Sequence, residues 1–427
     1  MAIGVKSSNN WKLPFFTIWT GQIFSLVGTA IGRFALIWWL TDLTGSATVL
    51  AGSSLLSIAP RVFLGPLAGV VIDRSNRKKI MILADAFTGL VSLWLAYLFW
   101  SGSMAVWHVY VVIFARSLGS IFHGPAMTAS TSLMVPEGQL SRVAGMNQTL
   151  EGILSFLGPA LGAIALELIP LHSVMLIDVG TALLAILSLF LIAVPNPARK
   201  PSENGEKTSM WIELKQGFQY ILSWKGMAIF LGMAMSINFM LTPTFSLMPL
   251  LVKQEFLGGA PELAMLESAS GIGLLVGGLL LSVWGGFRKK ALTLLSGTAM
   301  LGVAILALGV APASAFWFAI ASSVFIGVIL PFVNGTIGAM LQATIAPELQ
   351  GRVFTVTNSL SSAMSLLSLA VAGPIADTVG LRTMIIASGV VCLLEGLFGF
   401  LVPALMGMEE QAQQMKKSYA EMVPAKG

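Results

Sequence analysis

Long apolar runs follow one another along the whole chain and are separated by shorter polar segments. Most of them reach the length of about 18–20 residues that an α-helix needs to cross a bilayer. They lack the strict alternation that is typical of membrane barrel strands. The pattern therefore predicts twelve transmembrane helices. The expected spans are 14–41, 47–72, 80–100, 104–133, 144–170, 172–194, 226–252, 263–286, 289–310, 315–344, 353–379 and 382–405.

The composition agrees with this reading of the pattern. Of the 427 residues, 56% are hydrophobic and only 10% are charged. Soluble domains carry about 25% charged residues, so a water-soluble domain is excluded. The single cysteine, Cys392, excludes a disulfide framework and is expected to pack within its apolar run. We predict an all-α, multi-pass membrane protein.

One long polar stretch divides the spans six plus six. It runs over residues 195–225, begins with two prolines and ends in a short amphipathic segment over 211–218. The predicted organisation is a six-helix bundle over 1–194, a cytoplasmic linker with an amphipathic helix over 195–225, a second six-helix bundle over 226–405 and a cytoplasmic tail over 406–427.

Lysine and arginine are distributed unequally between the two sides of the membrane. With the N-terminus placed inside, nineteen of the 24 fall on the inner side and only Lys253 and Arg382 on the outer side. Arg33, Arg61 and Arg116 lie within spans. The positive-inside rule therefore predicts that both termini are cytoplasmic. It also explains the net charge of +5 without a nucleic-acid partner.

An internal repeat supports two related bundles. Arg77-Lys78-Lys79 returns as Arg288-Lys289-Lys290, and Pro136-Glu137 returns as Pro347-Glu348, each 211 residues later. Each pair lies at the same place in its half. Two homologous six-helix bundles, related by an axis along the membrane normal, are the architecture that this repeat predicts.

Glycine and proline recur in the middle helices of the expected three-helix units. The packing candidates are Gly158, Pro159 and Gly162 in the fifth span, and Gly373 and Pro374 in the eleventh. The eighth span carries Gly277-Gly278 instead. Glycine lets helices approach closely in lipid, and proline permits bending, so we expect flexible packing surfaces between moving halves. The alternative is that both residues are simply common in membrane helices.

The loop after the second span carries a known family signature. It reads Gly69-Val70-Val71-Ile72-Asp73-Arg74-Ser75-Asn76-Arg77-Lys78-Lys79. This segment resembles the Gly-x-x-x-Asp-Arg-x-Gly-x-Arg/Lys-Arg/Lys motif of the major facilitator superfamily. Asn76 replaces the second glycine of the motif. Because asparagine tolerates left-handed backbone, we expect the turn to be kept.

The resemblance implies a cytoplasmic gate at this loop, made by Gly69, Asp73, Arg74, Arg77 and Lys78. In the resembled fold, Asp73 would cap the N-terminus of the eleventh helix and favour the state that is closed to the inside. The cations would hold the loop at the anionic inner surface, or would simply satisfy the positive-inside rule.

Other segments are similar to the macrolide-efflux and multidrug branch of the superfamily. Arg116 resembles the buried arginine of the fourth helix, and Gly158-Pro159-x-x-Gly162 resembles the fifth-helix motif of antiporters and exporters. The stretches 15–22 and 34–38 are similar to the macrolide-efflux relatives. The resemblance implies a monomeric proton antiporter in the inner membrane of a bacterium, which exports amphipathic small molecules by alternating access.

Charged residues within spans are the first candidates for coupling to a proton gradient. Glu151 leads, because it is expected to be buried on the gating helix and on the face of Gly158. Arg116 and Asp178 could pair, as a coupling site or as a structural ion pair, and Arg33 completes the set. Asp85 is expected close enough to the inner interface to be solvated, and Glu395 is the carboxylate noted in the second half.

Polar residues on cavity-lining helices of the resembled fold are Asn238, Thr242 and Asn334, whose alternative role is hydrogen bonding between helices. His123 could sense pH, although hydrogen bonding is the commoner role. We find no P-loop, metal-ligand spacing or nucleophile motif, so neither an enzyme nor a cofactor or metal is expected. A gradient-driven importer and a non-transporting membrane sensor remain as alternatives.

Overall fold

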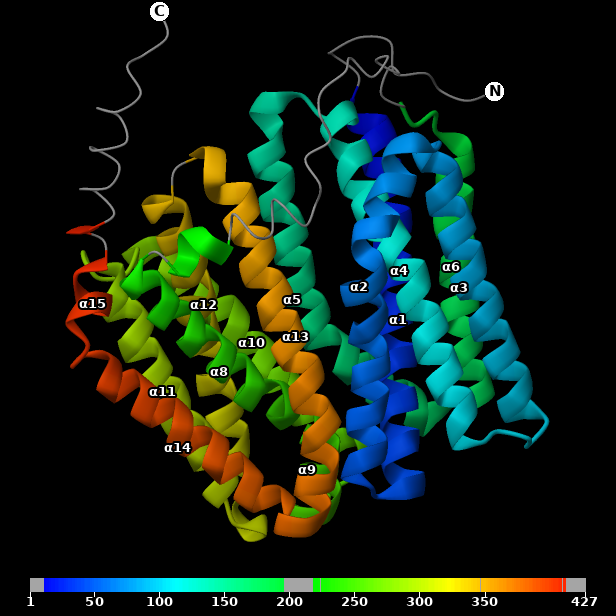
Figure 1. The fold of residues 1–427 in the computed structure, drawn as a ribbon. Coiled ribbons are helices and arrows are strands. Elements are labelled where there is room, and N and C mark those ends of the chain that lie inside the picture. Colours follow the sequence, from blue (N-terminus) through cyan, green and yellow to red (C-terminus); the bar gives the residue numbers. More distant parts are fainter. Residues whose placement is uncertain (1–10, 196–217, 223, 346, 409, 412–427) are drawn as a thin grey trace, which may run out of the picture. The chain divides into compact units, whose positions relative to one another are not determined.

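The computed structural model describes residues 11–195, 218–222, 224–345, 347–408 and 410–411. Helices dominate this part of the chain (Figure 1). Twelve of the described helices are long and apolar enough to cross a membrane, as the sequence predicts. By their contacts, the residues fall into two compact units, the first from 1–201 and 246–271, the second from 202–245 and 272–427.

The first unit holds six long helices, one short helix and the start of another long one. They are α1 (Lys12–Thr44), α2 (Ala47–Arg74), α3 (Arg77–Trp100), α4 (Val106–Met134), α5 (Glu137–Leu168), α6 (Leu171–Leu191), the short α9 (Met248–Glu255) and the first half of α10 (Ala260–Trp284).

The second unit holds the remaining helices. They are α8 (Lys225–Ser246), the second half of α10, α11 (Lys290–Val310), the 3₁₀ turn η1 (Ala313–Ala315), α12 (Phe316–Thr344), α13 (Pro347–Val379), α14 (Leu381–Gly399) and the short α15 (Pro403–Met406).

Within the first unit, α1 packs against α5 and α6, α3 against α4 and α6, and α2 against α4. Two clusters of buried apolar side chains fill the space between these helices. One gathers around Phe15, Met81 and Leu189, and the other around Leu95 and Met175. Since each cluster draws its side chains from distant parts of the chain, the apolar faces of separate helices pack together in both.

In the second unit, α11 contacts α14 and α12 extensively, and α13 contacts α14. Figure 1 shows α11 and α14 running side by side. Gly302 of α11 faces the backbone of Leu393, and Gly396 of α14 faces the backbone of Ala299. A side chain at either glycine would collide with the neighbouring helix, so glycine allows this close contact.

The turn between α2 and α3 differs from the expectation. Asn76 has φ −74° and ψ 111°, which is extended backbone and not left-handed. Its side-chain Oδ1 accepts a hydrogen bond from the backbone N–H of Lys79 at 3.1 Å. Asn76 therefore stands in this turn as an N-cap of α3, because its side chain satisfies one of the free N–H groups of the first helical turn.

The seventh expected span, 226–252, is also different in the structure. The helix ends at Ser246, and a second, shorter helix, α9, begins at Met248. Pro249 lies in the first turn of α9, where its missing N–H is tolerated. A continuous helix would place this proline ring against the carbonyl of Phe245, so the chain breaks at Leu247.

The proposed linker and tail fall mainly outside the described residues. The amphipathic segment 211–217 and the residues after 411 are among those not described. The boundaries of the four sequence segments and the cytoplasmic position of the termini therefore stay predictions.

Candidate functional site

All three arginines within the spans of the first half line one cavity of about 630 Å³ in the first unit. Arg33 comes from α1, Arg61 from α2 and Arg116 from α4. The remaining lining residues are Leu26, Thr29, Leu36, Ile37, Ser53, Ser54, Ser57, Ile58, Ile113, Ser117 and Ser120. The cavity thus combines guanidinium groups and hydroxyls with aliphatic walls. Pockets of about 300–1,000 Å³ suit drug-sized ligands.

Arg116 and Asp178 form a buried ion pair, with Arg116 Nη1 2.9 Å from Asp178 Oδ2. Their side chains are 12% and 2% exposed, so Asp178 is fully buried and Arg116 is mostly covered, with part of it at the cavity wall. The Ser92 hydroxyl donates to Asp178 Oδ2 at 2.6 Å, and the Thr29 hydroxyl donates to Oδ1 at 2.9 Å. The pairing that the sequence suggested is present, and it links α4, α6, α3 and α1.

Arg33 of α1 and Glu267 of α10 lie close enough for their opposite charges to attract, although no ion pair forms between them among the described contacts. The sequence analysis gave Glu395 as the carboxylate of the second half, which overlooked Glu267 although it lies within the expected span 263–286. Glu267 is half-buried, and the residue four positions further on, Gly271, faces the α5 backbone at Phe156.

Glu151 lies elsewhere on the surface of the first unit. Its side chain is exposed, so the expectation of burial is wrong. None of the described contacts joins its carboxylate to Arg33, Arg116 or Asp178. Whether Glu151 is exposed depends on how α5 is rotated about its own axis. That rotation cannot be predicted from the position of a residue along the chain.

The fifth-helix glycines pack inside the first unit. A Cβ at Gly158 would lie 3.0 Å from Ala30 Cβ, and one at Gly162 would lie 2.8 Å from Phe34 Cβ. Both neighbours belong to α1, which α5 contacts extensively. These glycines therefore permit close packing of α5 on α1, and Pro159 is buried beside them.

Asp85 is buried, contrary to the expectation that solvent reaches it. Gln22 Nε2 of α1 donates to Asp85 Oδ2 at 3.1 Å, and His123 Nε2 of α4 lies 3.3 Å from Asp85 Oδ1. The carboxylate thus meets two polar side chains from neighbouring helices. This makes an acid–base pair in the first unit, separate from Asp178.

Two cations of the signature loop bind backbone carbonyls inside the unit. Arg77 Nη1 donates to the Ala129 carbonyl at 2.6 Å, and Lys78 Nζ donates to the Ile192 carbonyl at 2.8 Å. The Ile192 carbonyl is at the C-cap of α6, where carbonyls lack helical partners, and Ala129 lies in the last two turns of α4. Arg74 is exposed, Gly69 is half-buried, and the side chain of Asp73 lies outside the described parts of the structure.

Polar residues expected to line a cavity in the second half make contacts within their own unit. Thr242 of α8 donates to the Ser365 hydroxyl of α13 at 3.1 Å, and Asn238 Nδ2 donates to the Ala234 carbonyl at 2.9 Å. The Thr242 bond joins two helices, as the alternative of hydrogen bonding between helices expects, whereas the Asn238 bond lies within α8. Asn334 is exposed, while in α13 Gly373 is buried and Pro374 exposed.

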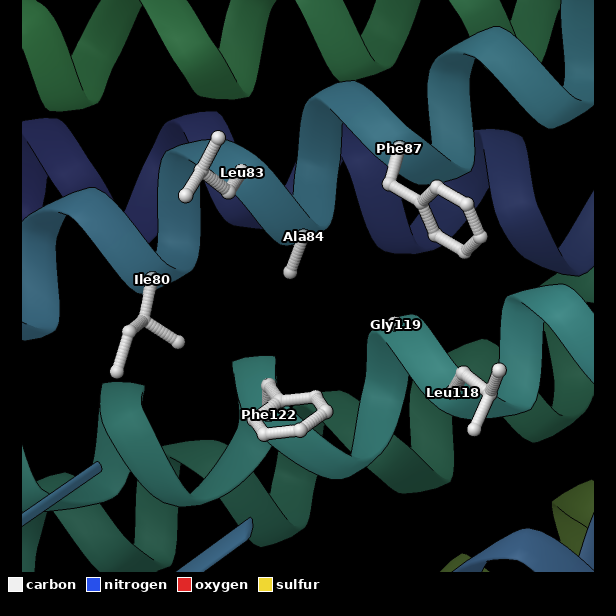
Figure 2. Close-up of a pocket in the computed structure, with 7 residues that line it drawn as sticks. All are labelled: Ile80, Leu83, Ala84, Phe87, Leu118, Gly119 and Phe122. Carbon is white, nitrogen blue, oxygen red and sulfur yellow. The ribbon is translucent and has the colours of Figure 1, made fainter. Parts of the chain in front are cut away.

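Another pocket lies between α3 and α4 and has a different character. Figure 2 shows Ile80, Leu83, Ala84 and Phe87 of α3 facing Leu118, Gly119 and Phe122 of α4 across it. The pocket has a volume of about 260 Å³, and none of its seven lining residues is polar. It offers no group that could orient a polar substrate. Among the described residues, no cluster of His, Cys, Asp and Glu could hold a metal ion.

Residues 18–369 match the family model of the Major Facilitator Superfamily. This chain belongs to the Major Facilitator Superfamily. It is 34% identical over 391 residues to macrolide efflux protein A of Streptococcus pyogenes, covering 91% of this chain and 96% of the relative. It is 24% identical to the multidrug efflux pump Tap of Mycobacterium tuberculosis, covering 94% of this chain and 96% of that pump.

Solved structures agree with the family fold. The nucleoside transporter NupG matches with a TM-score of 0.66 at 13% sequence identity, covering 92% of this chain and 98% of that structure. The chain is therefore a transporter of this superfamily and not an enzyme, with twelve described helices that can span a membrane. It is a protein of the bacterial inner membrane, and it acts on a small-molecule substrate.

Sequence reasoning did not assign Arg61 or the serines of the cavity. A signal for them was available, because Ser53, Ser57 and Arg61 recur every four residues and so share one face of α2. Ser120 follows Arg116 by four residues and shares its face of α4 in the same way. Polar residues at helical spacing within a membrane span indicate a face turned away from lipid.

Proposed function

We propose that this superfamily transporter exports amphipathic small molecules of the macrolide and multidrug type by proton antiport, with access alternating between the two sides of the membrane. The observation that carries the proposal is the 34% identity to macrolide efflux protein A over nearly the full length of both chains. The similarity to a multidrug efflux pump over 94% of the chain supports export.

The cavity in the first unit fits such a substrate. Its guanidinium groups offer hydrogen-bond donors and its hydroxyl oxygens can accept hydrogen bonds, while Leu26, Leu36 and Ile113 give apolar surface. A pocket that is mostly apolar with a few polar groups favours molecules with both characters. We place the substrate-binding site of the first unit here.

A proton is the coupling ion in this proposal, because the sequence offers carboxylates within spans and no nucleotide-binding motif. Glu151, Asp178, Arg116 and Arg33 remain the coupling candidates. Asp178 lies in the buried network behind the cavity wall, whereas Glu151 is exposed on α5.

The gate motif forms the remaining part of the proposal. We assign the inner latch to Asp73 at the end of α2. In this proposal both termini are cytoplasmic, and the protein is a monomer. Support comes from the neighbouring cations, since Arg77 and Lys78 tie the start of α3 to carbonyls near the ends of α4 and α6. A fixed loop is a suitable base for a contact that must form and break.

The proposed function predicts drug resistance that depends on the proton gradient. Expression in a drug-sensitive bacterium should raise the inhibitory concentration of erythromycin and of unrelated amphipathic drugs relative to an empty vector. A protonophore should restore intracellular accumulation of labelled erythromycin, because the driving force is removed. Unchanged susceptibility across a broad panel would contradict export, and increased susceptibility would indicate an importer.

A second prediction tests the coupling residue. Glu151→Gln should abolish uphill export yet leave substrate exchange down a gradient, because it removes a titratable group without breaking a described contact. Uptake into inside-out vesicles, with and without an imposed proton gradient, separates the two activities. Glu167→Gln is the matched control, since Glu167 is also exposed on α5. Normal uphill export by Glu151→Gln would move the coupling role to Asp178.

A further inference from the structure

The wall of the arginine-lined cavity in the first unit carries more positive than negative charge. Three guanidinium groups line it, and no lining residue carries a carboxylate. Charges at membrane depth are costly unless they are paired, so they mark functional sites by default. The question is which negative groups balance these three cations.

Two of the three arginines have a carboxylate within the first unit. Asp178 lies behind Arg116 at 2.9 Å, and the charge of Arg33 acts on Glu267. Arg61 has no ion pair or hydrogen bond with any described residue. Its side chain is exposed at the cavity, so the guanidinium is free to meet a bound molecule.

Further polar groups lie close to Arg61. Arg61 shares its helix face with Ser57 and Ser53, and the hydroxyls of Ser54 and Ser120 line the same space. Arg116 also has a buried amino nitrogen, Nη2, without a hydrogen-bond partner among the described residues. The hydroxyls of Ser53, Ser57 and Ser120 already donate to backbone carbonyls, so the unused donors of the wall are mainly guanidinium N–H groups, and no lining residue offers negative charge.

The geometry of a guanidinium group indicates what would complete this site. Its planar fork of N–H donors matches a carboxylate or a phosphate with two parallel hydrogen bonds. The aliphatic side chains Leu26, Leu36, Ile37, Ile58 and Ile113 would contact an apolar body attached to such a group. A neutral or cationic ligand would leave Arg61 without a counter-charge.

We propose that the cavity between α1, α2 and α4 binds the single acidic group of an amphipathic molecule through Arg61. The inference deepens the proposed function and rests on it, because it names an anionic class among the molecules exported. Arg61 forms the ion pair with the acidic group, the Ser54 hydroxyl donates to one of its oxygens, and the aliphatic wall holds the hydrocarbon part.

The test compares two probes of the same shape on the purified full-length protein in a non-ionic detergent. The probes are 1-pyrenebutyric acid, which is a monoanion at neutral pH, and its uncharged methyl ester. The wild type should bind the acid about ten-fold more tightly than the ester, since one hydrogen-bonded charge pair is worth at least that factor. Fluorescence anisotropy gives both dissociation constants.

Variants assign the preference to a residue. Arg61→Gln should lose the preference for the acid, and Arg61→Lys should keep part of it because the charge remains. Arg142→Gln is the matched control, since it removes the same charge from an exposed position on α5, outside the cavity. Thermal unfolding of each variant shows whether a loss of binding reflects a loss of fold.

Equal binding of acid and ester by the wild type overturns the inference, as does a preference that survives in Arg61→Gln. Displacement of the acid by added phosphatidylglycerol in the wild type, but not by phosphatidylcholine, would identify a lipid headgroup as the occupant and overturn the substrate assignment. Erythromycin resistance, measured for the same variants in cells, tests the proposed function separately. Resistance without acid binding contradicts only the inference, whereas acid binding without resistance contradicts only the export of macrolides.

Discussion

Replacing Asp178 by leucine should lower the free energy of unfolding by about 3–5 kcal/mol. The substitution leaves the Arg116 guanidinium buried without its carboxylate, and it removes the acceptor of the Ser92 and Thr29 hydroxyls. In a membrane interior no water replaces these partners. After detergent extraction, size-exclusion chromatography measures the amount of folded protein, and thermal unfolding measures the loss of stability.

The double variant Asp178→Leu/Arg116→Met separates the ion pair from the packing around it. Because both charges are removed together, it should regain most of the stability that Asp178→Leu loses. A double variant whose loss is the sum of the two single losses would show that the pair is not coupled. If the double variant folds but does not transport, the pair has a role beyond stability.

Asp42→Leu provides a control with an exposed ion pair. Asp42 lies 3.0 Å from Lys253, but its side chain is 65% exposed. Exposed pairs contribute about 0–1 kcal/mol, so this substitution should change stability little. A loss as large as that of Asp178→Leu would contradict the argument that burial sets the size of the effect.

The helices and the Arg116–Asp178 pair were predictable from sequence for the same physical reason. Lipid requires that backbone groups are bonded within helices, so a long apolar run has one structural outcome. Lipid also requires that buried opposite charges meet, which made Arg116 and Asp178 natural partners. In both cases the environment leaves few alternatives, and the order of residues is enough.

Burial of a single side chain was harder to predict. Glu151 was expected to be buried and is exposed, whereas Asp85 was expected to be solvated and is buried beside Gln22 and His123. The depth of a residue along a span follows from its number. Which way the side chain points depends on the rotation of the helix against its neighbours, which is decided by packing with distant segments.

The arginine cavity could be predicted only in part. Each of Arg33, Arg61 and Arg116 was visible as a charge within a span, but they lie on three different helices. The cavity exists because α2 contacts α4 and α1 contacts both. The spacing of Ser53, Ser57 and Arg61 gave the face of α2, but not the residues opposite it.

The glycine motifs were expected to form flexible packing surfaces between moving halves, and the structure shows which of the glycines make close contacts within a unit. Gly277 and Gly278, which the sequence analysis noted in the eighth span, are neighbours in α10. A Cβ at Gly277 would lie 2.7 Å from the carbonyl carbon of Val328 and 2.8 Å from its Cα, on the backbone of α12. A Cβ at Gly278 would meet nothing within 4 Å. Only the first glycine therefore allows α10 and α12 to touch.

Gly277→Ala should consequently destabilise the second unit, whereas Gly278→Ala should not. The added methyl at Gly277 meets backbone atoms that cannot rotate away, so α10 and α12 must separate, at a cost of about 1–3 kcal/mol or more. At Gly278 the methyl meets open space, and the higher helix propensity of alanine favours the helix by up to about 1 kcal/mol. Thermal unfolding of the two purified variants measures the difference. The two substitutions change the same residue type in the same helix, so equal effects would mean that α10 and α12 do not meet at Gly277.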